Sequence, residues 1–144
     1  MLATVTSVYV FLAGCLIVPI AIRDIAAPGT ELPLPGDAAF MKCSGASSLD
    51  RTPTMRLMVQ VTGLMNATLT LAAMASTFQK ERSTMQIVGL GFVSLAYIMV
   101  VNQEAWFACD KEADFTPYIA LLAVEGLLMV MSSIVGPGAK EKTS

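Results

Sequence analysis

The chain has 144 residues, the length of one domain, and it is 55% hydrophobic and 14% charged, with a net charge of −2. With a mean hydropathy of +0.66 it is too apolar for a soluble domain and belongs to the membrane class. The weakly acidic balance offers no cationic face for nucleic acid, and the absence of histidine argues against metal and triad chemistry.

The first apolar run, residues 2–22, has about the 20 residues that a helix needs to cross the hydrocarbon core. It lacks the basic start of a signal peptide and stays apolar beyond Pro19, so we predict a retained first span. The next segment, residues 23–52, is rich in proline, glycine and serine, and is predicted to be a long polar loop.

The second span is predicted over residues 53–78 and the fourth over residues 117–135. Each follows a threonine that can cap the helix, Thr52 or Thr116, and opens with a proline at the first helical position. Pro at this position loses no hydrogen bond that the helix needs. The second and fourth spans are therefore both predicted to begin at a Thr-Pro pair.

The third span is predicted over residues 84–102, with Ser83 and Gln86 at the spacing of a capping box. The link 79–82 before it is so short that the second and third spans must form an antiparallel hairpin.

The fold class that these segments predict is an all-α integral membrane protein, a four-transmembrane-helix antiparallel bundle. The whole chain, 1–144, forms one membrane domain with a short tail over residues 136–144. An even number of spans places both termini and the 79–82 link on one side. The loops over residues 23–52 and 102–114 then share the other side.

The cysteines give a hint about orientation, because basic residues are almost equally divided between the two sides. Cys43 and Cys109 fall on the loop side, whereas Cys15 lies in the first span. If the loop side is oxidising, Cys43 and Cys109 can form a disulfide; the alternative is two free thiols. A disulfide places the termini toward the cytosol, stroma or matrix.

Glu125 is a carboxylate in the fourth span, near mid-membrane depth. A charge there costs several kcal/mol unless it is paired, hydrated or protonated. The functional hypotheses are a proton or cation site, a ligand contact, or an axial ligand to a pigment magnesium. The structural hypothesis is a protonated carboxyl that is hydrogen-bonded to a neighbouring helix.

A polar stripe on the second span is formed by Thr62, Asn66 and Thr70 at i, i+4 and i+8, with Gln60 on another face. If Glu125 faces this stripe, Asn66 is its best partner. Glu125, Asn66 and Gln60 are thus the candidate contacts for pigment or lipid, with interhelical hydrogen bonding as the structural alternative for the amides. These groups lack a nucleophile–base pair, so we predict no catalytic residue and no metal site.

Small residues on the second and third spans mark candidate helix-contact faces, Gly63 with Ala67 and Gly89 with Ser94. We expect these faces to receive helices of partner subunits.

The first functional hypothesis is a non-catalytic accessory subunit of a larger photosynthetic or respiratory membrane complex. Its partners would be other membrane subunits and the lipid bilayer, and its helices would contact chlorophyll, carotenoid, quinone or bound lipid. An acidic chain without an arginine-rich start favours a thylakoid over a mitochondrial inner membrane.

The alternative is an endoplasmic-reticulum protein with four spans that binds lipid or sterol or assists the assembly of other membrane proteins. Its pocket would be Glu125 with the polar stripe. The last five residues, 140–144 (KEKTS), fit the spacing of a dilysine retrieval signal. A small transporter is the third hypothesis.

Overall fold

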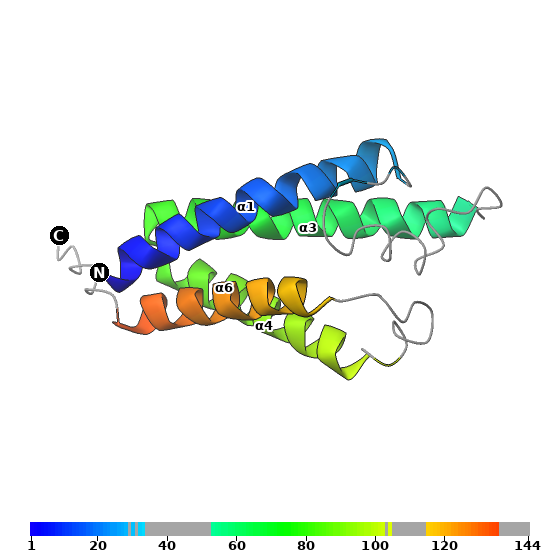
Figure 1. Cartoon of the computed structure of the whole chain (residues 1–144). Helices are drawn as coiled ribbons and strands as arrows, with labels where there is room; N and C mark the ends of the chain where they lie inside the picture. The colour runs from blue at the N-terminus through cyan, green and yellow to red at the C-terminus, as the bar shows by residue number, and fades with distance from the viewer. Residues whose placement is uncertain (29, 31, 34–52, 103, 105–114, 136–144) are drawn as a thin grey trace.

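The computed structural model describes residues 1–28, 30, 32–33, 53–102, 104 and 115–135 (Figure 1). This part of the chain contains the helices α1 (Leu2–Ala26), α3 (Pro53–Gln79), α4 (Arg82–Val101) and α6 (Thr116–Val135). All four are long and apolar enough to cross a membrane. For the described residues the prediction of an all-α fold with four such segments is confirmed, and α3 and α6 begin within one residue of the predicted starts.

The first helix continues past its predicted end at residue 22, and it contains Arg23 and Asp24 as buried residues. Nε of Arg23 lies 2.8 Å from Oδ1 of Asp24. The guanidinium also donates a hydrogen bond to the carbonyl of Thr30 at 2.6 Å. The prediction that a loop begins at residue 23 is therefore wrong, because each charge finds a partner within the last turn of the helix and just beyond it.

The link between α3 and α4 is a Schellman motif. Lys80 has a φ of 56°, in the left-handed region. The N–H of Glu81 donates to the carbonyl of Ser76 at 2.9 Å, and the N–H of Lys80 donates to the carbonyl of Thr77 at 3.4 Å. The chain reverses in this turn and forms the antiparallel hairpin that the short link predicts (Figure 1).

The predicted capping box of the third span is wrong. The helix α4 begins at Arg82, before Ser83, and its N-cap is Glu81 without a side-chain hydrogen bond. The backbone N–H of Met85 donates to the carbonyl of Glu81 at 3.0 Å. Because the turn before α4 is so short, the helix already includes Ser83, which therefore cannot be the N-cap residue.

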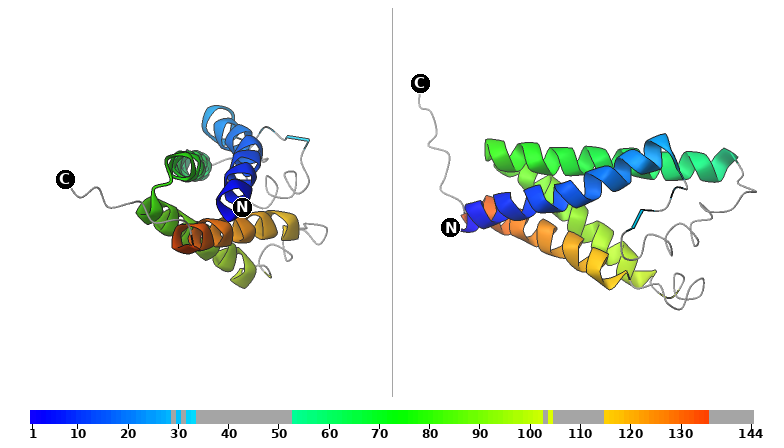
Figure 2. Two further views of the ribbon diagram at one scale, coloured as in Figure 1. Left: turned by 90° about the vertical axis from the view of Figure 1, so that its left-hand side faces the viewer. Right: turned by 45° about the horizontal axis from the view of Figure 1, so that its top comes forward.

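The helices associate as two pairs, since α1 packs mainly on α3 and α4 mainly on α6. Figures 1 and 2 show that the pairs lie together at the end that holds the N-terminus and the 79–82 link, and separate toward the other end. The first half of α1 contacts α6 and its second half contacts α3. The first helix therefore connects the two pairs.

Glycines allow the helices of each pair to approach closely. A Cβ atom on Gly63 of α3 would lie 2.6 Å from Cβ of Asp24 and 2.9 Å from the carbonyl oxygen of Ala21. In the other pair, a Cβ on Gly126 would lie 2.5 Å from the carbonyl oxygen of Gly89. Both pairs are therefore held at backbone contact distance.

The expectation that Gly63 and Gly89 serve partner subunits is wrong, because both are buried against helices of the same chain. Of their companions, Ala67 is half-buried and Ser94 is exposed.

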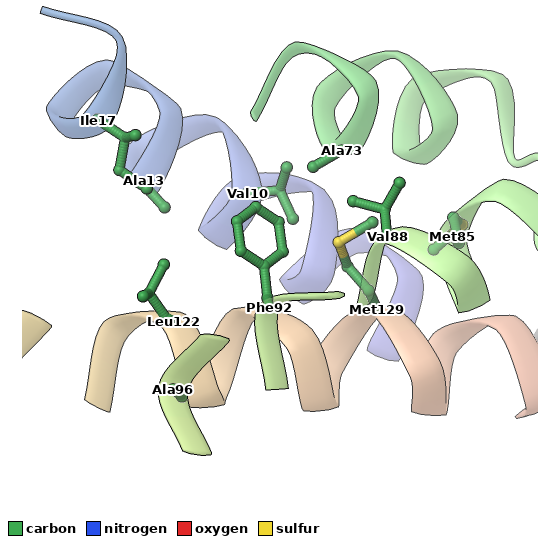
Figure 3. Packing of buried hydrophobic residues seen from close by; sticks show 10 residues of the cluster. All are labelled: Val10, Ala13, Ile17, Ala73, Met85, Val88, Phe92, Ala96, Leu122 and Met129. Atoms are coloured by element: carbon green, nitrogen blue, oxygen red, sulfur yellow. The ribbon is translucent and has the colours of Figure 1, made fainter. Parts of the chain in front are cut away.

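The hydrophobic core lies where the two pairs meet (Figure 3). All four helices contribute to it, with α4 and α1 providing most of the side chains: Val10, Ala13, Ile17, Ala73, Met85, Val88, Phe92, Ala96, Leu122 and Met129. The outer faces of the helices carry large exposed aliphatic side chains, among them Leu12, Leu64, Ile98 and Ile134. Such a surface is suited to hydrocarbon and not to water.

Candidate functional site

Glu125 lies on the buried face of α6, between Leu122 one turn before it and Met129 one turn after it. Its exposed fraction is 0%. The carboxyl group therefore points into the protein at the level of the hydrophobic core, and it is shielded from lipid by the chain itself.

Neither oxygen of the Glu125 carboxyl has a hydrogen-bond partner among the residues that the structure describes. A buried polar group without a partner costs about 1–3 kcal/mol, and an unpaired charge costs more. The structural hypothesis, a carboxyl hydrogen-bonded to a neighbouring helix, does not hold for the described part of the chain. A charged carboxylate would cost more than a neutral carboxyl at this position, because no described residue hydrogen-bonds to it.

Two polar contacts between α1 and α6 bracket Glu125. The hydroxyl of Tyr9 donates to the carbonyl of Leu121 at 3.2 Å. The hydroxyl of Thr6 donates to the carbonyl of Leu2 in its own helix at 3.0 Å, and it also lies 3.4 Å from the carbonyl oxygen of Leu128. Because Leu121 and Leu128 are α6 residues on either side of Glu125 in sequence, the contact line between α1 and α6 passes over the carboxyl. We call this line the α1–α6 seam.

Aromatic side chains from three helices contribute to the core next to Glu125. Tyr9 of α1 is half-buried at the seam, and Tyr118 of α6, two turns before Glu125, is also half-buried; both pack against the core cluster. Phe92 of α4 belongs to that cluster together with Leu122 and Met129 (Figure 3). The core beside the neighbours of Glu125 on α6 thus includes aromatic side chains.

Glu125 does not face the polar stripe of α3, so the condition for a pairing with Asn66 is not met in the described structure. Within the described residues α3 packs on α1 and α4 and makes at most marginal contact with α6. The three residues of the polar stripe also differ in exposure, because Thr70 is buried, Asn66 is half-buried and Thr62 is exposed. The stripe therefore does not form one pocket with the carboxyl, although the hydroxyl of Thr70 also has no partner in the described structure.

Gln60 lies away from Glu125, near the end of α1. Its side-chain nitrogen donates a hydrogen bond to the carbonyl of Ile25 at 3.0 Å. This contact satisfies one of the last carbonyls of α1 and ties that helix to α3. Its position gives Gln60 a structural role, and a contact with pigment or lipid stays a prediction.

Cys15 is an exposed free thiol on α1. Cys43 and Cys109 lie outside the described residues, so their disulfide stays a prediction. The residues that the structure does describe contain no group of three or more Cys, Asp or Glu side chains that could hold a metal ion.

Sequence reasoning missed Tyr9 and Tyr118 as neighbours of the acid. The spacing of seven residues between Tyr118 and Glu125 places both on one helical face and could have indicated Tyr118. Tyr9 carries no such signal, because its position depends on which helices pack together.

The described residues thus form four helices that are long and apolar enough to cross a membrane, and the Glu125 carboxyl is buried among them without a hydrogen-bond partner. No protein family, no curated protein and no solved structure matches the chain.

Proposed function

We propose that the chain is a non-catalytic membrane protein that binds an apolar molecule, a lipid, sterol or pigment, whose polar end meets Glu125. The observation that supports this function is the buried carboxyl, whose two oxygens have no hydrogen-bond partner in the part of the chain that the structure describes. Replacing such a group by an apolar side chain of similar size is often neutral or stabilising, so the acid adds little to folding. A polar group of this kind inside a membrane bundle is a functional-site candidate by default.

The surroundings of the acid favour a ligand that is soluble in lipid. The side chains next to Glu125 on the buried face of α6 are apolar or aromatic, and the outer faces of α1 and α6 carry exposed aliphatic residues. A water-soluble ligand would lose its hydration there without replacement hydrogen bonds. A mainly apolar molecule loses only the hydration of its polar end.

The experiment is native mass spectrometry of the protein purified from its own membranes in a mild detergent. The wild type is expected to carry a defined adduct that withstands detergent exchange, and Glu125→Leu is expected to lose most of it. Wild type without any adduct, or equal adducts on both proteins, would contradict this function. This candidate fits an endoplasmic-reticulum location.

A second candidate is the accessory subunit of a larger photosynthetic or respiratory complex. It is supported by large apolar side chains exposed along all four helices, such as Phe11, Leu71, Leu90 and Leu127, which are suited to neighbouring subunits, chlorophyll or carotenoid as well as to lipid. It fits a thylakoid or mitochondrial inner membrane. Native gel migration in mild detergent separates the candidates, since a stoichiometric large complex supports this one and a free monomer or dimer supports the first.

A further inference from the structure

We propose that the ligand of the Glu125 site carries an amine at its polar end, so that the site selects a hydrophobic amine over an alcohol of the same shape. This inference rests on the proposed binding function and specifies the chemistry of the ligand. It is carried by the oxygens of Glu125, which have no partner among the described residues, by the aromatic side chains of the adjoining core, and by the distribution of basic residues.

The oxygens of Glu125 can accept hydrogen bonds from donors of a ligand. Both are buried without a partner in the described structure. The hydroxyl of Tyr9 uses its proton on the carbonyl of Leu121, so its oxygen keeps lone pairs that can accept a hydrogen bond. An ammonium has several N–H donors and can serve both the carboxylate and such an acceptor, whereas a hydroxyl has one.

The aromatic side chains favour a cation. Tyr9, Tyr118 and Phe92 come from α1, α6 and α4, and they pack in or against the core that contains Leu122 and Met129, the neighbours of Glu125 on the buried face of α6. The face of an aromatic ring attracts a desolvated cation and has no comparable preference for a hydroxyl. Aromatic side chains in the core next to the acid therefore favour an amine over an alcohol.

The basic residues of the described structure leave this position without a protein cation. Arg23, Arg56, Lys80 and Arg82 all lie at or beside helix ends, and Arg23 is paired with Asp24. Glu125 lies in the middle of α6, away from these ends. A ligand amine would thus provide the positive charge that the acid lacks.

The α1–α6 seam is the route by which the amine would arrive from lipid. Glycine contacts at backbone distance hold each helix pair together, whereas side-chain hydroxyls of Thr6 and Tyr9 join the pairs at the seam. A neutral amine that enters there takes the carboxyl proton, so an ammonium–carboxylate pair forms with no change in total charge. The charge-assisted hydrogen bonds that result are roughly twice as strong as neutral ones.

The test uses two long-chain photoreactive diazirine probes that differ only in their end group, a primary amine or a hydroxyl. Protein in phosphatidylcholine nanodiscs is labelled over a range of probe concentrations, and the labelled residues are located by mass spectrometry. The amine probe is expected to label the α1–α6 seam of the wild type saturably, at concentrations on the order of tenfold lower than the alcohol probe.

Glu125→Gln is the decisive variant, because Gln keeps the shape and the hydrogen-bonding groups of a neutral acid but cannot give up a proton. It should remove the preference for the amine and leave labelling by the alcohol nearly unchanged. Glu81→Gln, at an exposed position, is the matched control and should behave as wild type. Glu125→Asp keeps the acid and should retain part of the preference, which provides a second variant if Glu125→Gln folds poorly.

Two results would overturn the inference in different ways. Saturable labelling of the wild-type seam by both probes at equal concentrations, or by the alcohol at lower ones, would exclude amine selectivity and leave the binding function standing. Failure of both probes to label the seam saturably would contradict the binding function as well.

Discussion

At the scale of single residues, the chain buries ionisable side chains in two different ways. Arg23 and Asp24 are both buried, and they neutralise each other at the end of α1. Glu125 is equally buried in the middle of α6 without a partner among the described residues. The first arrangement is that of a structural ion pair, and the second makes Glu125 a candidate for a functional residue.

Asp24→Asn is expected to destabilise the protein, because it keeps the shape of the side chain and leaves the buried guanidinium of Arg23 without its carboxylate. Removal of one partner of a buried pair costs about 3 kcal/mol. Unfolding by a titration of denaturing detergent measures this loss. Glu81→Gln removes an exposed carboxylate and should leave the midpoint unchanged. Equal midpoints for the two variants would show that the ion pair is not structural.

Sequence reasoning found Glu125 because a carboxylate in an apolar run is conspicuous, and it missed the buried pair for a physical reason. Arg23 and Asp24 follow directly after the apolar run, where charged residues ordinarily mark a loop. Their burial depends on Thr30 and on the close approach of α3 at Gly63. Neither contact can be recognised from the residues next to Arg23 and Asp24 in the sequence.

At the scale of helices, long apolar runs determine where a span lies and leave open which faces meet. The helices of a membrane bundle are apolar on most sides, so periodicity does not identify the contact face. Small residues gave the right faces at Gly63 and Gly89 but the wrong partners, since these faces meet α1 and α6 of the same chain. Which helices meet at these glycines depends on how closely their backbones approach one another, and only the folded structure shows that.

Two glycines of α4 provide a matched test of the contact with α6. A Cβ on Gly89 would lie 2.8 Å from the carbonyl oxygen of Gly126, whereas a Cβ on Gly91 would meet only Leu69, at 3.7 Å. Gly89→Ala should therefore destabilise the protein by about 1–3 kcal/mol through overpacking. Gly91→Ala should be neutral or stabilising by up to about 1 kcal/mol, because alanine is the better helix former. Equal effects of the two substitutions in detergent unfolding would contradict close packing of α4 on α6.

At the scale of the whole molecule, the two helix pairs and the crossing of α1 between them define where the site lies. The pairs meet at the end with the N-terminus and the 79–82 link (Figure 2). A helix of twenty residues, such as α4, is about 30 Å long, which matches the hydrocarbon thickness. The residues at its two ends should therefore face opposite sides of the membrane.

Single cysteines test this arrangement in sealed vesicles with a maleimide that does not cross membranes. Lys80→Cys and Glu104→Cys, both at exposed positions, are placed separately in a background in which the native cysteines at positions 15, 43 and 109 are serine. In vesicles of uniform orientation, one of the two is expected to react from outside and the other only after permeabilisation. Reaction of both from the same side would exclude a span between them.

The central claim is that Glu125 serves a ligand and not the fold. The most direct measurement is the thermal unfolding midpoint of Glu125→Leu against the wild type, both stripped of bound lipid by exchange into detergent. Because no described residue hydrogen-bonds the carboxyl, leucine fills the same buried position without the cost of desolvating a polar group. We predict an unchanged or higher midpoint for the variant. A midpoint lowered by the equivalent of about 3 kcal/mol or more, the cost of breaking a buried polar pair, would show that the acid holds the bundle together and would contradict the claim.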